Sequence, residues 1–135
     1  MKAYPYLNFK GQCEEAFHFY ADAVGAKIVV VSKFADSPMA DQVSPEMKNK
    51  VIHGRIMVGD TLVMASDSMD RYETPKGFSM TLTTGTPEEA ERAFANLSKG
   101  GEVNMPMSET FFAHRFGRLR DKFGIPWMVI CEKQM

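Results

Sequence analysis

The chain has 135 residues, with 16 lysine and arginine residues against 17 aspartate and glutamate residues and a net charge of −1. This length suits one domain with a sizeable core, and the near-zero charge gives no field that would steer nucleic acid or an anionic membrane toward it. The two cysteines, Cys13 and Cys131, have no CxxC spacing, so we expect neither a disulfide framework nor a structural zinc site. Because the sequence shows no signal peptide and no apolar run of about 18 residues, we expect a cytoplasmic protein without a membrane segment.

Hydrophobic periodicity predicts one helix and several strands in the first half of the chain. The expected order is a strand over 3–9, a helix over 13–24, a strand over 27–34, and strands over 51–58 and 61–66. Gly25 is placed to end the helix in the left-handed conformation, and Gly59-Asp60 forms a short hairpin turn. Residues 35–50 contain two prolines and many polar residues, so they form the longest predicted loop, a candidate lid.

The second half of the chain predicts the same order of elements. We expect a strand over 77–84, a helix that follows Thr86 and ends before Lys99-Gly100-Gly101, strands over 102–107 and 109–119, and a last strand over 127–131. Thr86 is the expected N-cap, with Glu89 as the capping-box residue. Asp121 and Gly124 open and close the turn of the final hairpin.

The two halves also repeat each other in sequence. Cys13-Glu14-Glu15-Ala16 matches Pro87-Glu88-Glu89-Ala90, and Gly25-Ala26-Lys27-Ile28 matches Gly100-Gly101-Glu102-Val103. We therefore expect an α+β fold in a single domain of two βαβββ modules, at about 1–70 and 76–135. The modules would form a curved eight-stranded mixed sheet around a pocket, with the helices on the outer face.

Four motifs resemble the vicinal oxygen chelate superfamily, which includes glyoxalase I, extradiol dioxygenases and fosfomycin-resistance proteins, and within it the PhnB-like branch. The motifs are YLNF from Tyr6, FYADAVGAKI from Phe19, HGRIMVGDTLVMASD from His53 and ETFFAHRFGRLRDKFGIPWM from Glu109. The resemblance implies the superfamily's fold, a pocket between the modules and a homodimer.

Active members of the superfamily usually hold one divalent metal with a His or Glu from the first and last strand of each module. With Phe19-Tyr20 and Gly124 as anchors, the resemblance puts Pro5, Met64, Phe78 or Ser79, and Met128 at the four ligand positions. None of these is a good ligand for a hard divalent ion, so we expect no metal cofactor. If a divalent metal does bind, the alternative ligands are His53, Glu109 and Glu132.

The candidate site residues fall into three groups. His53 is the candidate catalytic residue, as a base or hydrogen-bond donor, and its alternative role is a strand-end histidine bonded to backbone. The expected pocket lining is Met64, Phe78, Trp127 and Met128, with Tyr6, Asn8 and Ser66 as its polar groups. Glu109, His114 and Arg115 could hold an anionic group of the substrate, or else belong to a solvated or dimer-facing strand; residues 109 and 115 would share one face of that strand, and His114 the other.

Two functions follow from these residues. The first is a protein that binds a small apolar or aromatic molecule in the sheet pocket without the usual metal. The alternative is a divergent lyase or dioxygenase in which a divalent metal stabilises developing enolate or alkoxide charge. A methyltransferase finds no support, because the sequence has no GxGxxG after a strand and no doubly wound pattern that would bind a nucleoside cofactor.

Overall fold

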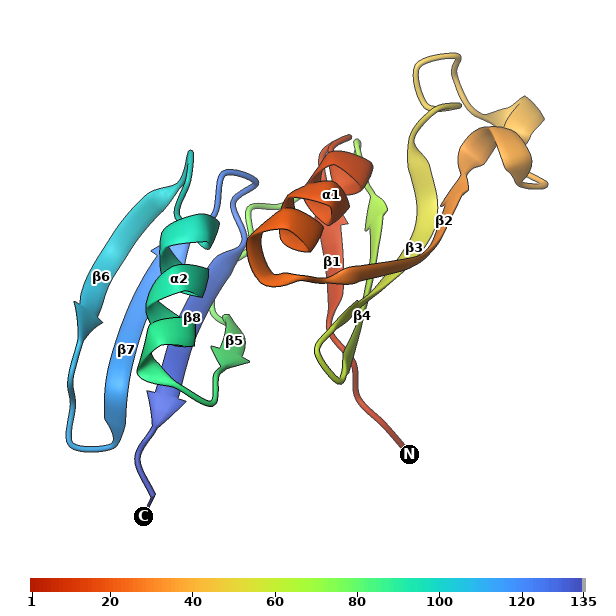
Figure 1. The fold of residues 1–135 in the computed structure, drawn as a ribbon. Helices are drawn as coiled ribbons and strands as arrows, with labels where there is room; N and C mark the ends of the chain where they lie inside the picture. Colours follow the sequence, from red (N-terminus) through yellow and green to blue (C-terminus); the bar gives the residue numbers. More distant parts are fainter. Residues whose placement is uncertain (135) are drawn as a thin grey trace. The chain divides into compact units, whose positions relative to one another are not determined.

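The structure is a computed structural model that describes residues 1–134. It contains two compact units, Met1–Glu73 and a second that begins at Thr74. Each unit has one α-helix and one four-stranded sheet, with its elements in the order strand, helix, three strands (Figure 1).

Unit 1 contains β1 (Tyr6–Phe9), α1 (Cys13–Val24), β2 (Lys27–Lys33), β3 (Val51–Val58) and β4 (Thr61–Asp67), with short 3-10 turns at Phe34–Asp36 and Ala40–Gln42. Its strands pair in the order β1-β4-β3-β2. The β1–β4 pair is parallel, and the β3–β4 and β2–β3 pairs are antiparallel. The sheet is therefore mixed, as the sequence predicts.

Unit 2 contains β5 (Met80–Thr83), α2 (Pro87–Leu97), β6 (Glu102–Ser108), β7 (Ala113–Arg120) and β8 (Pro126–Glu132). Its strands pair in the order β5-β8-β7-β6, which repeats the order of the equivalent strands in unit 1. The β5–β8 pair is again parallel and the other pairs are antiparallel. The predicted α+β class and the βαβββ repeat are confirmed, and the eight strands divide equally between two sheets.

The ends of both helices follow the local signals in the sequence. Gly25 has φ 72° and its amide donates to the carbonyl of Ala21, which ends α1 in a left-handed cap. Thr86 Oγ1 accepts from the amide of Glu89 at 3.1 Å, and Glu89 Oε1 accepts from the amide of Gly85 at 3.2 Å. These bonds confirm the predicted caps. The sequence could predict them because each cap depends only on neighbouring residues.

The first turn of α1 has a partner from a distant strand. Gln12, at the N-cap position, makes no side-chain cap. Asp67 Oδ1 instead accepts from the amide of Cys13 at 2.9 Å, while Asp67 Oδ2 accepts from the amide of Val51 at 2.9 Å. This buried carboxylate therefore joins the helix start to β3 and β4.

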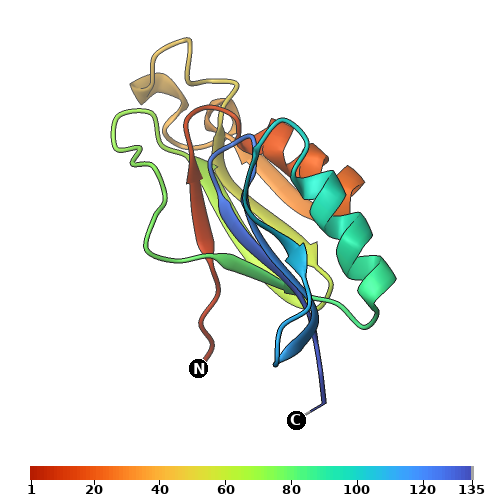
Figure 2. The same ribbon diagram turned by 90° about the vertical axis from the view of Figure 1, so that its left-hand side faces the viewer.

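Each helix packs an aromatic ring on a glycine of a central strand. A Cβ on Gly54 of β3 would lie 2.6 Å from the ring of Phe17, and a Cβ on Gly117 of β7 would lie 2.8 Å from the ring of Phe94. Only glycine permits these contacts. Each helix thus covers one face of its own sheet, and among residues 1–134 no helix of the same unit crosses the other face (Figures 1 and 2).

Three predicted strands are shorter in the structure. The strand expected over 3–9 begins at Tyr6, and the one expected over 77–84 spans Met80–Thr83. The strand expected over 109–119 begins only at Ala113. Thr110 Oγ1 accepts from the amides of Phe112 and Ala113, and this side-chain turn takes amides that a continuing strand would have used.

We predict that Gly117→Ala lowers the free energy of unfolding by about 1–2 kcal/mol, because Phe94 and Met107 must move to admit the methyl group. Gly85→Ala is the control, since a Cβ at Gly85 meets nothing within 4 Å. Urea unfolding of both variants checks the prediction. Equal midpoints would contradict it.

Candidate functional site

The uncovered face of each sheet carries the candidate site residues, and we call it the open face. Successive side chains of a strand point to opposite faces. Gly117 and its partner Val129 lie on the side of α2, so Arg118 and its partner Met128 project from the open face of unit 2. The same register in unit 1 puts Met64 on its open face, because the neighbouring Ala65 pairs with Gly54 beneath Phe17.

The open face of unit 1 brings together five residues that the sequence predicts for the site. Tyr6 pairs with Met64, and Asn8, two residues further along β1, pairs with Ser66. The His53 ring lies beside Tyr6, with ring centroids 6.0 Å apart. The cluster offers a phenol, an imidazole, an amide and a hydroxyl on three neighbouring strands, β1, β4 and β3.

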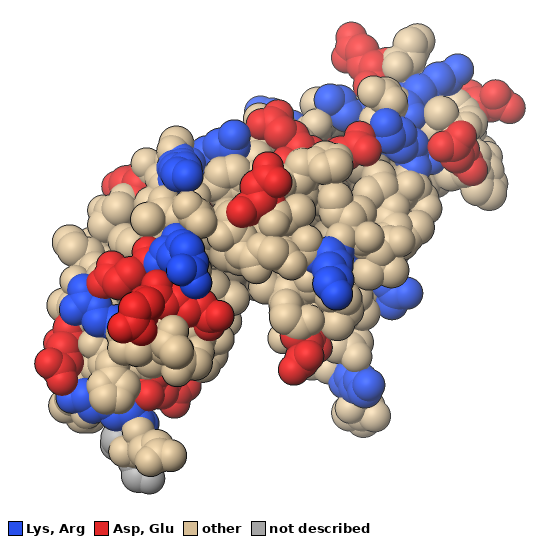
Figure 3. Space-filling model, in the orientation of Figure 1, with Lys and Arg blue, Asp and Glu red and all other residues tan. Residues whose placement is uncertain are grey.

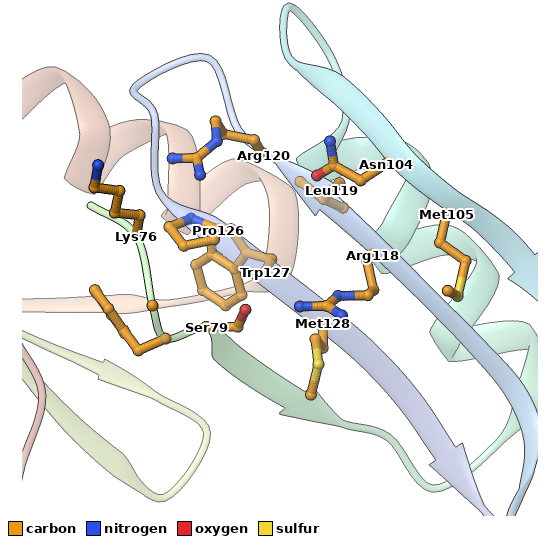
Figure 4. A pocket seen from close by; sticks show the side chains of 12 residues that line it. Lys76, Ser79, Asn104, Met105, Arg118, Leu119, Arg120, Pro126, Trp127 and Met128 are labelled. Atoms are coloured by element: carbon orange, nitrogen blue, oxygen red, sulfur yellow. The ribbon is translucent and has the colours of Figure 1, made fainter. Parts of the chain in front are cut away.

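Unit 2 has a pocket of about 580 Å³ on its open face (Figure 4). The lining residues are Lys76, Gly77, Phe78, Ser79, Asn104, Met105, Arg118, Leu119, Arg120, Pro126, Trp127 and Met128. They come from the segment before β5 and from strands β6, β7 and β8. Phe78, Trp127 and Met128 are the predicted site residues that this pocket collects.

The pocket combines apolar side chains with positive charge. Phe78 is 50% exposed and Met105 is 42% exposed, so both side chains are available to a ligand. Three basic residues line the pocket: Lys76, Arg118 and Arg120. None of its described lining residues is acidic. The two arginines are not among the residues predicted from the sequence, although their alternation in Arg118-Leu119-Arg120 signals that both lie on one face of β7.

Trp127 lies in the pocket wall but is only 2% exposed. Its Nε1 donates to Asp121 Oδ2 at 2.9 Å, and Asp121 Oδ1 accepts from the amides of Phe123 and Ile125. Asp121 is itself buried. The indole therefore fixes the β7–β8 turn to the wall and presents little of its own surface to the pocket.

Arg120 fixes the segment that carries Phe78. Its Nη1 donates to the carbonyl of Gly124 at 2.6 Å and to the carbonyl of Pro75 at 2.8 Å. Pro75 belongs to the segment before β5, whereas Gly124 belongs to the β7–β8 turn. One guanidinium thus holds two sides of the pocket together.

The three residues expected to hold an anionic group have different surroundings. Glu109 lies outside β7 and pairs with Lys133 at 2.8 Å, and the hydrogen bond and charge of Lys133 lower the pKa of this exposed carboxyl. Arg115 lies on the side of α2, where its Nε donates to Glu91 Oε1 at 2.6 Å. His114 is exposed next to a register shift between β7 and β8. Glu109 and Arg115 therefore do not share a strand face.

The residues that the resemblance puts at metal positions are Pro5 and Met64 in unit 1, and Phe78 or Ser79 with Met128 in unit 2. Among residues 1–134, no group of three or more His, Cys, Asp or Glu side chains is placed to hold an ion. Pro5 lies beside Met64, whose amide donates to its carbonyl at 3.1 Å. Met128 pairs with Thr81 in unit 2. Neutral thioethers and a proline do not fit a hard divalent ion.

The alternative metal ligands are divided between the units. His53 belongs to unit 1, and Glu109 and Glu132 belong to unit 2. Neither unit by itself contains the whole set.

Charge on the surface is mixed in sign. On the face shown in Figure 3, lysine and arginine side chains alternate with aspartate and glutamate side chains. Within residues 1–134, no helix is long and apolar enough to cross a membrane.

Comparison with known proteins supplies the family. A family model described as 3-demethylubiquinone-9 3-methyltransferase matches residues 1–130. The chain belongs to this PhnB-like family. It is 34% identical over 139 residues to Protein YjdN of Escherichia coli K12. The match covers 96% of this chain and 95% of YjdN.

Solved structures agree with this membership. This PhnB-like chain is 40% identical to protein PA1353 from Pseudomonas aeruginosa, with a TM-score of 0.86 over 99% of both chains. It is 28% identical to a Bacillus cereus protein described as a putative 3-demethylubiquinone-9 3-methyltransferase, PhnB protein, with a TM-score of 0.81 over 97% of this chain and 99% of that one.

A fosfomycin resistance protein, FosX, from Listeria monocytogenes shares the fold alone. It is 10% identical, with a TM-score of 0.68 over 98% of this chain and 92% of that one. The predicted PhnB-like membership is confirmed by the family model, and the likeness to FosX agrees with the predicted fold.

We predict that Asp121→Asn lowers the free energy of unfolding by about 2 kcal/mol, since an amide cannot accept all three hydrogen bonds and its NH₂ would face the donor of Trp127. Asp60→Asn, in the exposed β3–β4 turn, is the matched control and should leave stability unchanged. Thermal melts of both variants measure the difference. Equal melting temperatures would show that the carboxylate does not stabilise the turn.

Proposed function

We propose that this PhnB-like protein binds a small molecule with an apolar or aromatic body in the pocket of unit 2. The observation that carries the proposal is the pocket itself, whose volume of about 580 Å³ lies in the range of roughly 300–1,000 Å³ that is typical of small-molecule sites. Phe78 and Met105 supply exposed apolar surface, and the half-buried Met128 supplies the floor.

The chemistry of the lining supports an aromatic or irregular apolar ligand. Phe78 can stack on an aromatic ring through its exposed face. Met105 and Met128 carry flexible, polarisable thioethers, which adapt to ligands of different outline. Trp127, held by Asp121, supplies a rigid wall behind them.

The polar cluster of unit 1 is a second candidate point of contact with a ligand. His53 is our candidate base there, because its imidazole lies beside Tyr6 on the open face. Tyr6 and Ser66 supply hydroxyl donors on the same open face. Replacing His53 with Ala should reduce turnover only if the protein also catalyses a reaction.

We propose that binding does not use a divalent metal, because the side chains at the family's ligand positions are poor donors. The alternative is a divergent metal-dependent lyase or dioxygenase that uses His53 with Glu109 or Glu132. The ion pair between Glu109 and Lys133 opposes this alternative, since a metal ion would have to displace the ammonium group.

Methyl transfer, which the family's description names, is not part of the proposal. A nucleoside-type methyl donor is typically bound by a doubly wound parallel sheet. The sheets described within residues 1–134 are mixed and mostly antiparallel.

We also propose a homodimer located in the cytoplasm. Strand β2 lies at a sheet edge and exposes Ile28, Val29 and Val30, and such an edge favours association with another chain. Cys13 and Cys131 are free thiols, as a reducing compartment maintains them.

We predict that Phe78→Ala weakens binding of the uncharged fluorescent probe N-phenyl-1-naphthylamine about fivefold, because the variant loses roughly 1 kcal/mol of aromatic contact. Phe111→Ala is the matched control, since Phe111 is 83% exposed and lies outside the pocket. Fluorescence titration gives both affinities. If the native protein does not bind the probe, or if the two variants bind it equally, the proposed site is wrong.

We predict that chelator-treated protein does not bind manganese, nickel or zinc at a stoichiometry of one ion per chain. The reason is that thioethers and proline do not coordinate these ions well. Calorimetric titration measures the stoichiometry, and a thermal melt measures any stabilisation. Tight binding that raises the melting temperature would favour the metal-dependent alternative. His53→Ala would then test whether that imidazole is a ligand.

A further inference from the structure

Arg118 lines the pocket, and its guanidinium donors are not used by other described residues. Within the residues that the structure describes, its guanidinium has no hydrogen bond or ion pair. The neighbouring arginines of β7 differ, because Arg115 pairs with Glu91 and Arg120 donates to two carbonyls. Arg118 therefore lies on the open face of unit 2 with its donors available to a ligand.

The position of Arg118 directs it at the pocket. It pairs with Met128 on one side and with Met105 on the other, so it lies between the two thioethers of the lining. In Figure 4 its guanidinium points across β8 toward the hydroxyl of Ser79. The charge of Arg118 and the hydroxyl of Ser79 thus both line the pocket beside the apolar side chain of Met128.

The rest of the lining adds to the positive potential. Arg120 keeps its charge although its Nη1 is used by the carbonyls of Gly124 and Pro75. Lys76 is a third basic residue of the lining, and no described lining residue is acidic. A ligand with an anionic group is favoured there, and a cationic ligand is repelled.

We infer that Arg118 binds an anionic group of the ligand, so that the ligand class is a small aromatic or apolar oxyanion such as a carboxylate. This inference rests on the proposed function, because the apolar body of the same ligand would lie on Phe78 and Met128. A planar guanidinium donates two parallel hydrogen bonds to two oxygens of one anionic group. The Ser79 hydroxyl would donate a further bond to that group.

The test compares two fluorescent probes that differ by one charged group. These are 8-anilinonaphthalene-1-sulfonate and the uncharged N-phenyl-1-naphthylamine. In the full-length native protein the sulfonate should bind more tightly, and its advantage should fall as sodium chloride is raised from 20 to about 500 mM. Arg118→Gln should weaken the sulfonate about tenfold, as expected for loss of charge-assisted hydrogen bonds, and should change the uncharged probe less than about twofold.

Arg92→Gln is the matched control. Arg92 lies exposed on α2, which covers the other face of the sheet, so this variant loses the same charge without touching the pocket. It should bind both probes as the native protein does. If Arg92→Gln weakens the sulfonate as much as Arg118→Gln, the effect is net charge alone and the inference is wrong.

The remaining outcomes separate this inference from the proposed function. If the uncharged probe binds in the pocket but Arg118→Gln leaves the sulfonate unchanged, the pocket is real and the anion site is refuted. If neither probe binds, the proposed function fails and the inference fails with it.

Discussion

The pocket of unit 2 depends on one buried carboxylate, that of Asp121. It accepts hydrogen bonds from two backbone amides of the β7–β8 turn and from the indole of Trp127. These bonds set where β8 begins, and hence which residues of β7 and β8 face each other. A shift of one residue would turn Met128 and Arg118 toward α2. The turn from Asp121 to Gly124 is therefore a structural requirement of the pocket.

The second constraint is that each helix covers only one sheet face. Gly54 and Gly117 let the rings of Phe17 and Phe94 approach the central strands, which brings each helix close to its sheet. The opposite faces carry no helix of their own unit, so their polar and charged side chains remain available for ligands. The repeat provides two such faces with different chemistry. The face in unit 1 carries Tyr6 and His53, and the face in unit 2 carries the cationic pocket.

The chemistry of these faces departs from that of metal-dependent members of the superfamily. The resemblance drawn from the sequence puts proline and methionine at positions where an enzyme of this kind would use histidine or glutamate. An open face that binds through stacking, thioether contact and a guanidinium selects ligands by shape and charge. The proposed recognition by Arg118 and adaptation by Met105 and Met128 would require no bound ion, and this is why we favour a binding function.

The sequence by itself determined the elements, the repeat and the PhnB-like family. The elements were predictable because Gly25, Thr86, Glu89 and the Asp121 turn act on neighbouring residues. It also indicated that Met64 and Met128 face away from the helices. Only the tertiary structure decided which charged residues are available. Arg115 and Glu109 looked suitable for an anion, but Glu91 and Lys133, distant in sequence, neutralise them, whereas Arg118 lacks such a partner among the described residues. Ion pairs depend on which strands and helices lie side by side, and that information is not local in the sequence.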